Sequence, residues 1–135
     1  AWIPGKRFFE LHLADAAVPA GAPVSATDVQ AQPFFFNDFL VKNPATTAVI
    51  PVKGDSMIDA GIYDGDLAVI ERKNSARVGK FVVAQVDGEF TLKELVKTKG
   101  AFALKAHNTR YALIHPKGKL QIVGVLVGIV RRYGN

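Results

Sequence analysis

The sequence predicts a mainly β protein: compact, twisted antiparallel sheets with one or two short helices and an extended N-terminal arm. From Thr46 onward, short runs rich in Val, Ile, Leu and Phe alternate with turn residues, a pattern typical of strands. Residues 14–33 are rich in Ala, Pro and Gly and lack a hydrophobic period, which indicates an extended linker. We therefore expect an arm and linker at 1–33 and a β-rich domain at 34–135.

Composition restricts the class of protein. With 135 residues, 49% of them hydrophobic and 21% charged, the chain suits one globular core. It contains no cysteine, which excludes disulfides and thiolate metal sites and suits the cytosol. No secretory signal opens it, and its longest apolar run, 120–130, is shorter than the roughly 20 residues of a membrane-spanning helix. We expect a soluble, cytoplasmic protein without a membrane anchor.

Charge is unevenly distributed along the chain. Residues 91–135 carry nine Lys or Arg against one acid, Glu94, within a formal net charge of +5. Such a region suits nucleic acid or an acidic partner, or it is simply a solvated surface with scattered lysines. Neither a helix-turn-helix pattern nor an aromatic-rich nucleic-acid motif accompanies the charge. We therefore favour the solvated surface and expect no direct sequence-specific DNA binding.

The elements follow in order along the chain. Alternating apolar residues over 2–13 predict an edge strand or a docked arm. The aromatic-rich segment 34–41 predicts a short helix that ends near Asn43-Pro44, with its aromatic side chains in the core. Strands are then expected at 49–52, 67–71, 80–86, 90–96, 101–106 and 120–133.

Asp87-Gly88 is the clearest local signal. Asp-Gly between two alternating apolar runs favours a two-residue type I′ hairpin, because the twist of that turn matches the twist of its strands. The turn fixes the register, so that Val82 lies opposite Lys93. One face of the hairpin then carries Lys93 together with Val82, Ala84, Thr91 and Leu95.

Ser56 and Lys93 are the candidate catalytic pair. Ser56 follows Gly54-Asp55 and precedes a short apolar turn, a setting that presents a nucleophile, although helix capping explains the same residues. A neutral lysine amine can remove a serine proton if burial lowers its pKa, and the Thr91 hydroxyl is placed to orient it. The alternative for Lys93 is an edge strand lysine that discourages aggregation.

Other chemistry has weaker support. The backbone amides of the 54–56 turn are candidate donors to an oxyanion. His12, His107 and His115 lie in no motif, so a Ser-His-Asp triad is disfavoured. The acidic residues Asp59, Asp64 and Asp66 fall in a turn-rich loop without metal-ligand spacing. We expect no metal and no cofactor.

Three motifs together resemble the LexA/UmuD family of self-cleaving serine–lysine proteins (peptidase S24-like). They are Gly-Asp-Ser-Met at 54–57, Asp-Gly-Asp at 64–66 and Asp-Gly-Glu-Phe-Thr-Leu-Lys at 87–93. The resemblance implies a fold of the LexA C-terminal-domain type, with Ser56 as nucleophile and Lys93 as general base. It implies an oxyanion hole formed by the amides of Asp55 and Ser56. The linker also contains the small-residue bond Ala20–Gly21, which matches the family's cleavage site.

The UmuD branch of the family fits best, because only 55 residues precede Ser56 and they contain no DNA-binding pattern. This branch implies a homodimeric accessory subunit of an error-prone, Y-family translesion DNA polymerase in the DNA-damage (SOS) response. Self-cleavage there is stimulated by RecA filaments on single-stranded DNA. The alternatives are a non-catalytic dimerisation and polymerase-binding module, the C-terminal part of a LexA-type or phage-type repressor, and a signal-peptidase-like enzyme.

Overall fold

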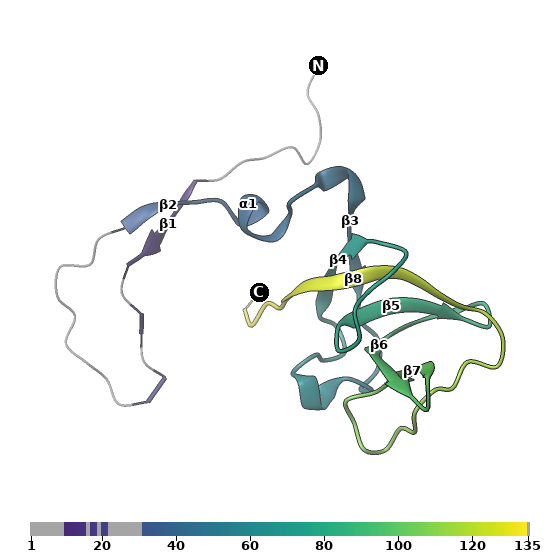
Figure 1. The fold of residues 1–135 in the computed structure, drawn as a ribbon. Helices are drawn as coiled ribbons and strands as arrows, with labels where there is room; N and C mark the ends of the chain where they lie inside the picture. The colour runs from purple at the N-terminus through teal and green to yellow at the C-terminus, as the bar shows by residue number, and fades with distance from the viewer. Residues whose placement is uncertain (1–9, 16, 19, 22–30, 135) are drawn as a thin grey trace. The chain divides into compact units, whose positions relative to one another are not determined.

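The computed structural model describes residues 10–15, 17–18, 20–21 and 31–134 (Figure 1). The chain separates into two compact units, Ala1–Lys42 and Asn43–Asn135. The division expected from sequence lay earlier, between residues 33 and 34, whereas the structure assigns the short helix α1 (Phe36–Leu40) to the first unit. The two units are therefore described separately.

The first unit contains a two-stranded antiparallel sheet. Strand β1 (Leu11–Ala14) overlaps the end of the strand predicted over 2–13, of which residues 2–9 lie outside the described residues. It pairs with β2 (Ala31–Phe34) from Leu11 opposite Phe34 to Ala14 opposite Ala31. Sequence analysis assigned most of β2 to the linker, because Ala31-Gln32-Pro33 carries no apolar alternation. The pairing places Ala14, at the end of β1, opposite Ala31, at the start of β2.

The expectation that the aromatic residues of 34–41 are core is wrong for two of them. Phe36 and Phe39 are 58% and 71% exposed. Both rings contact Phe34, with centroid distances of 5.0 and 5.5 Å. The physical reason is the shortness of α1, whose single turn places these rings against Phe34 at the end of β2 without burying them.

The second unit is a six-stranded antiparallel sheet in the order β3-β4-β8-β5-β6-β7. Its long strand β8 runs between β4 and β5 (Figure 1). All six strands expected from sequence are present, so the predicted mainly β fold is confirmed. They are β3 (Thr47–Pro51), β4 (Leu67–Arg72), β5 (Phe81–Val86), β6 (Glu89–Thr98), β7 (Ala101–Lys105) and β8 (Leu120–Val130). Two 3₁₀ helices, η1 (Pro44–Thr46) and η2 (Ile58–Ala60), precede β3 and β4 respectively.

Both faces of this sheet carry apolar clusters. Val82, Ala84, Leu95 and Leu104 form one buried cluster, and Ala68, Ile70 and Val83 form the other. Because neighbouring residues of a strand point to opposite faces, β5 contributes Val82 to one cluster and Val83 to the other. Gly124 of β8 permits close packing, since a Cβ added there would lie 2.3 Å from the Ile70 side chain. The packed central strands therefore hold the loops between them in fixed positions.

The predicted Asp87-Gly88 hairpin is confirmed. Val82 lies opposite Lys93 and Val86 opposite Glu89, which is the predicted register. Asp87 and Gly88 have φ values of 51° and 86°, and type I′ turns require a positive φ at both positions. The turn therefore sets which side chains of β6 share a face with the apolar residues of β5.

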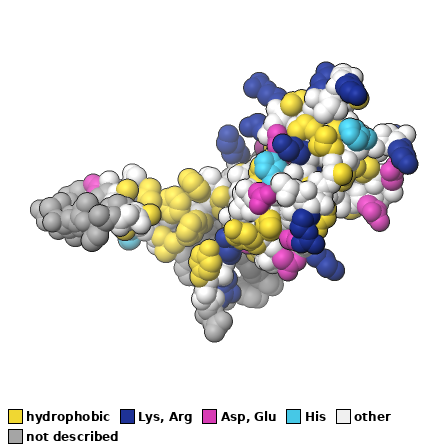
Figure 2. All heavy atoms as spheres, turned by 90° about the horizontal axis from the view of Figure 1, so that it is seen from below, with side chains coloured by type: hydrophobic (Ala, Val, Ile, Leu, Met, Phe, Trp, Pro, Cys, Tyr) yellow, Lys and Arg dark blue, Asp and Glu magenta, His cyan; other side chains and the backbone are white. Residues whose placement is uncertain are grey.

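Basic side chains on the visible surface are dispersed. Figure 2 shows Lys and Arg at several places on the face drawn, more of them than Asp and Glu. In the part of the chain that the structure describes, no helix is long and apolar enough to cross a membrane.

Candidate active site

Ser56 lies in a loop that is closed by hydrogen bonds to the turn before β4. Val52 N–H donates to the Asp66 carbonyl at 2.8 Å, and Gly65 N–H donates to the Val52 carbonyl at 2.8 Å. Gly54 N–H donates to the Asp64 carboxylate at 2.7 Å. Gly54 has a φ of +91°, a conformation that side-chain-bearing residues rarely adopt. The chain can therefore turn sharply just before Ser56.

Met57 fixes the other side of the serine. Its side chain is buried, and its carbonyl accepts hydrogen bonds from Ala60 and Ile62 at 3.0 and 3.2 Å. The short apolar turn expected after Ser56 contains the 3₁₀ helix η2, for which Met57 is the N-terminal flanking residue. Ser56 thus lies between a glycine turn and a buried anchor, so its side chain has a defined direction.

Lys93 is buried in the middle of the sheet. Strand β6 lies between β5 and β7, so Lys93 is not an edge strand lysine. It is only 8% exposed, and its neighbours on the same face, Val82 and Leu95, are buried. Removal from water disfavours the charged ammonium and lowers the pKa of Lys93 below its ordinary value.

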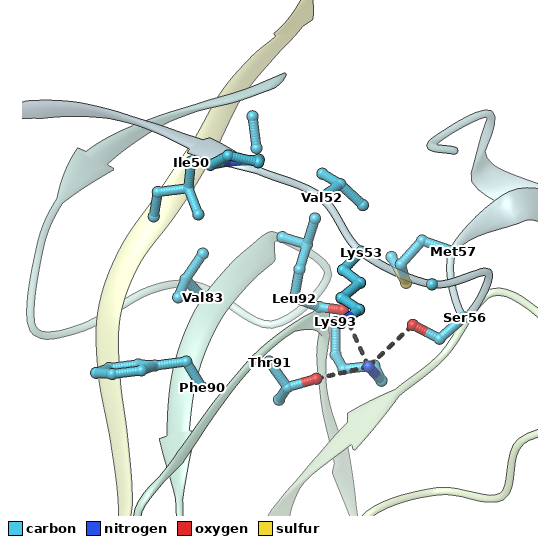
Figure 3. Close-up of a pocket in the computed structure, with 13 residues that line it drawn as sticks. Ile50, Val52, Lys53, Ser56, Met57, Val83, Phe90, Thr91, Leu92 and Lys93 are labelled. Carbon is cyan, nitrogen blue, oxygen red and sulfur yellow. Dashed lines mark hydrogen bonds between the residues drawn. The ribbon is translucent and has the colours of Figure 1, made fainter. Parts of the chain in front are cut away.

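Three oxygen atoms surround the Lys93 amine. Nζ lies 3.0 Å from Ser56 Oγ, 2.6 Å from Thr91 Oγ1 and 3.2 Å from the Leu92 carbonyl oxygen (Figure 3). A neutral amine has two N–H donors and one lone pair. It can donate to Thr91 and Leu92 while its lone pair accepts the Ser56 hydroxyl proton. The arrangement therefore suits an amine that takes a proton from Ser56.

An apolar groove of about 270 Å³ leads to this pair (Figure 3). Hydrophobic side chains from β3, β5 and the β6 hairpin form most of its lining, and Lys53, Ser56, Thr91 and Lys93 supply polar side-chain atoms. The apolar lining residues include Ile50, Val52, Val83, Phe90 and Leu92. A groove of this kind can hold an extended peptide with small side chains against the serine hydroxyl.

Backbone amides next to Ser56 are available to a ligand. Within the described ranges of the chain, the N–H groups of Asp55, Ser56 and Met57 donate no hydrogen bond, while the preceding Gly54 N–H is occupied by Asp64. Free amides grouped around a serine hydroxyl are the donors that stabilise a developing oxyanion. The Asp55 and Ser56 N–H groups, which were predicted for this role, are therefore not hydrogen-bonded to any other described residue.

The segment that follows β7 also contacts the Ser56 loop, which was not predicted. Asn108 Nδ2 donates to the Asp55 carbonyl at 2.9 Å, and the Tyr111 hydroxyl donates to the Asp55 carboxylate at 2.5 Å. Arg110 lies 3.4 Å from the same carboxylate. The residues in each contact are more than 50 positions apart in the sequence, and no periodic pattern or turn signal in 107–111 predicts the contacts. The one available signal was a polar Asn in a segment flanked by apolar runs.

The acidic turn after η2 also differs from expectation. Asp66 was expected to be an ordinary turn residue, yet it is 2% exposed. Its carboxylate receives two hydrogen bonds from Arg131, of 2.6 and 2.7 Å, and one from Tyr63 N–H at 2.8 Å. The hydrogen bonds from Arg131 lower the pKa of Asp66 below its ordinary value, against the opposing effect of burial. Asp66 and Asp64 therefore hold the Ser56 loop in place.

The remaining candidates lie elsewhere. His107 Nε2 lies 2.6 Å from Glu94 Oε1 and its ring packs edge-on against Phe81, so it is engaged away from Ser56. Among the residues that the structure describes, no group of three His, Cys, Asp or Glu residues could hold a metal ion. Ala20 and Gly21, which lie between β1 and β2 in the sequence, are both exposed.

Comparisons with known proteins give consistent results. Residues 12–127 match the family model described as peptidase S24-like. The chain is 44% identical to a LexA repressor of Opitutus terrae over 85% of this chain and 58% of that protein. It is 41% identical to a LexA repressor of Leptospira biflexa over 86% of this chain and 56% of that protein. Protein SamA of Salmonella typhimurium is 35% identical over 84% of this chain and 80% of that protein. The chain therefore spans somewhat more than half of these LexA repressors and most of SamA.

Proposed function

This chain belongs to the peptidase S24-like family, and from that premise we propose that it is a serine peptidase that cleaves its own Ala20–Gly21 bond. Ser56 is the nucleophile and Lys93 is the general base. The observation that carries the proposal is the 3.0 Å contact between Lys93 Nζ and Ser56 Oγ in a buried, largely apolar setting. Burial lowers the pKa of the amine, which is the condition a lysine must meet to act as a base.

The proposed reaction has two stages. Neutral Lys93 takes the Ser56 hydroxyl proton while Oγ bonds to the Ala20 carbonyl carbon, and the amides of Asp55 and Ser56 donate to the resulting oxyanion. The carbon–nitrogen bond to Gly21 then breaks, and the lysine ammonium gives its proton to the leaving amine. Water, deprotonated by the same amine, next attacks the Ser56 ester. Residues 1–20 leave with a free carboxylate, and Ser56 recovers its proton.

Features of the linker support Ala20–Gly21 as the scissile bond. Both residues are exposed, and neither has a bulky side chain that would keep the peptide away from the serine. They lie in the sequence between β1 and β2, in a stretch rich in Ala, Pro and Gly. The supporting role of Thr91, whose Oγ1 lies 2.6 Å from Nζ, is to hold the amine toward Ser56.

Self-cleavage is tested on the purified full chain by intact mass. Incubation at pH 10 should yield two fragments, residues 1–20 and 21–135, more rapidly than incubation at pH 7, because more of Lys93 is neutral at higher pH. Ser56→Ala should remain intact at both values. A wild-type chain that stays intact under all conditions would instead favour the non-catalytic binding module, and a break at another bond would refute the proposed site.

We also propose a cellular role for this activity, as a UmuD-like accessory subunit of a translesion DNA polymerase in the DNA-damage response. The match to SamA over 80% of its length supports this branch, while the LexA matches keep a repressor part as the alternative. The role implies a homodimer. It also implies that the incubation at pH 7 is accelerated by RecA, nucleotide and single-stranded DNA together, and by none of them alone.

A further inference from the structure

The peptide between Asp55 and Ser56 is held from outside the groove by a side chain that the reaction does not touch. Asn108 is 7% exposed and lies in the segment after β7. Its Nδ2 donates to the Asp55 carbonyl at 2.9 Å, and its Oδ1 accepts from Arg110 N–H at 3.0 Å. A carbonyl can only accept and an N–H can only donate, so these two partners determine which end of the amide faces Asp55.

Holding the Asp55 carbonyl has a consequence for Ser56. A trans peptide is planar, and its C=O and N–H point in opposite directions across the bond. The hydrogen bond from Asn108 to the Asp55 oxygen therefore sets the direction of the Ser56 N–H. That N–H donates no hydrogen bond within the described part of the chain and is one of the two amides assigned to the oxyanion.

We propose that Asn108 is a positioning residue for the oxyanion hole, acting through the Asp55–Ser56 peptide. This inference rests on the function proposed above. A donor that stabilises an oxyanion must already point at the place where charge develops, because reorientation during the reaction costs free energy. Asn108 is held in turn by Arg110 N–H, and its own carbonyl accepts from Tyr111 N–H at 3.0 Å.

Three neighbouring residues also bind Asp55 and help to fix the Asp55–Ser56 peptide. The Tyr111 hydroxyl and Arg110 both bind the Asp55 carboxylate, which keeps that negative charge turned to the exposed side of the loop. The Ile58 N–H also donates to the Asp55 carbonyl, at the longer distance of 3.3 Å. Loss of Asn108 therefore leaves the carbonyl with one longer hydrogen bond, from Ile58 N–H, and the direction of the Ser56 N–H is less firmly set.

Two substitutions distinguish loss of the Asn108 hydrogen bond to the Asp55 carbonyl from the effect of an added charge. Asn108→Ala removes the donor without adding charge, whereas Asn108→Asp keeps the shape and the acceptor for Arg110 N–H but cannot donate to Asp55. Both should lower the limiting rate of self-cleavage at high pH by between about 10- and 100-fold, less than the loss of an oxyanion donor itself. The apparent pKa of the rate profile should stay that of the wild type in Asn108→Ala, because this substitution adds no charge near Lys93.

Matched controls and a second measurement make the test decisive. Asn74→Ala and Asn74→Asp make the same changes at an exposed asparagine and should leave the rate unaltered. Cooperative urea unfolding identifies variants that are folded. The Ser56 amide resonance in a ¹H–¹⁵N NMR spectrum should move in both Asn108 variants and in neither Asn74 variant.

The possible results distinguish failure of the Asn108 positioning role from failure of the proposed self-cleavage. A limiting rate in Asn108→Ala within about twofold of the wild type would overturn the positioning role, as would an apparent pKa that shifts together with the rate. A rate lost only in Asn108→Asp would mean that added charge, and not the missing donor, is responsible. A wild-type chain that is not cleaved counts against the proposed function, and the Ser56 amide resonance still tests the positioning by Asn108.

Discussion

Lys93→Met lowers the rate of self-cleavage by between about 10²- and 10⁴-fold, the range expected when a general base is lost. Methionine fills a similar volume in the apolar surround of Val82 and Leu95 but cannot accept the Ser56 proton. In the wild type the rate rises with pH, because the neutral amine is the reactive form, and it levels off above the lowered pKa of Lys93. The measurement is the intact-mass time course between pH 6 and pH 11.

The matched control for this variant is Lys97→Met. Lys97 lies on the same strand β6, is exposed, and has its amine over the Phe102 ring at 5.5 Å, away from Ser56. It should cleave at the wild-type rate with an unchanged pH profile. Persistent, pH-dependent cleavage in Lys93→Met would assign the base to another group. An equal loss of self-cleavage rate in Lys93→Met and Lys97→Met would indicate that removal of any positive charge from β6 slows the reaction.

Arg131→Met lowers the free energy of unfolding, because the buried Asp66 carboxylate is left without its charged partner. The Asp66 carboxylate is 2% exposed, and it would lose both Arg131 hydrogen bonds while it kept that of Tyr63 N–H. Arg131 also donates to the Gly61 carbonyl at 2.7 Å, so the whole turn before β4 loses support. Urea unfolding followed by circular dichroism measures the difference.

The dependence on pH identifies Asp66 as the source of this effect. Its folded pKa lies below the ordinary value of 3.8, so its contribution is complete above that pH and is lost as the pH falls through the folded pKa. Without Arg131 the buried carboxyl binds a proton at a higher pH. The difference in unfolding free energy between wild type and Arg131→Met should therefore narrow as the pH is lowered from 7 to 3.

Two further variants are the controls for this pair. Arg132→Met changes the exposed neighbouring arginine and should alter the unfolding free energy by no more than about 0.5 kcal/mol. The double variant Asp66→Asn with Arg131→Met should recover part of the loss, because no unpaired charge remains buried. An unfolding free energy in Arg131→Met that matches Arg132→Met would show that the ion pair does not hold this loop.

Local signals in the sequence predicted most of the second unit. The six strands and the Asp87-Gly88 register follow from apolar alternation and turn chemistry, and the register alone brings Lys93 onto the buried face beside Val82. The second hairpin illustrates the limit of such signals. Lys99 and Gly100 also both have a positive φ, yet Lys-Gly is not a dipeptide that marks a type I′ turn. Its strands were predicted from their apolar runs and not from the turn.

Contacts between distant segments could not be predicted in this way. The hydrogen bonds of Asn108 to Asp55 and of Arg131 to Asp66 each join residues more than 50 positions apart. Nothing near Asp66 in the sequence distinguishes a buried, paired carboxylate from an exposed turn residue. The β1–β2 pairing was missed for a related reason, since a short strand containing Pro33 carries no strand signal of its own.

The central claim is that Ser56 forms a covalent ester with Ala20 while the chain is cut, and interception of that ester tests it most directly. Full-length protein is incubated at high pH with increasing hydroxylamine, which competes with water for the ester, and the fragment masses are recorded. We predict that residues 1–20 leave increasingly as the hydroxamic acid at Ala20, together with residues 21–135. Cleavage that yields only the free carboxylic acid at every hydroxylamine concentration would contradict the account, as would a break at another bond.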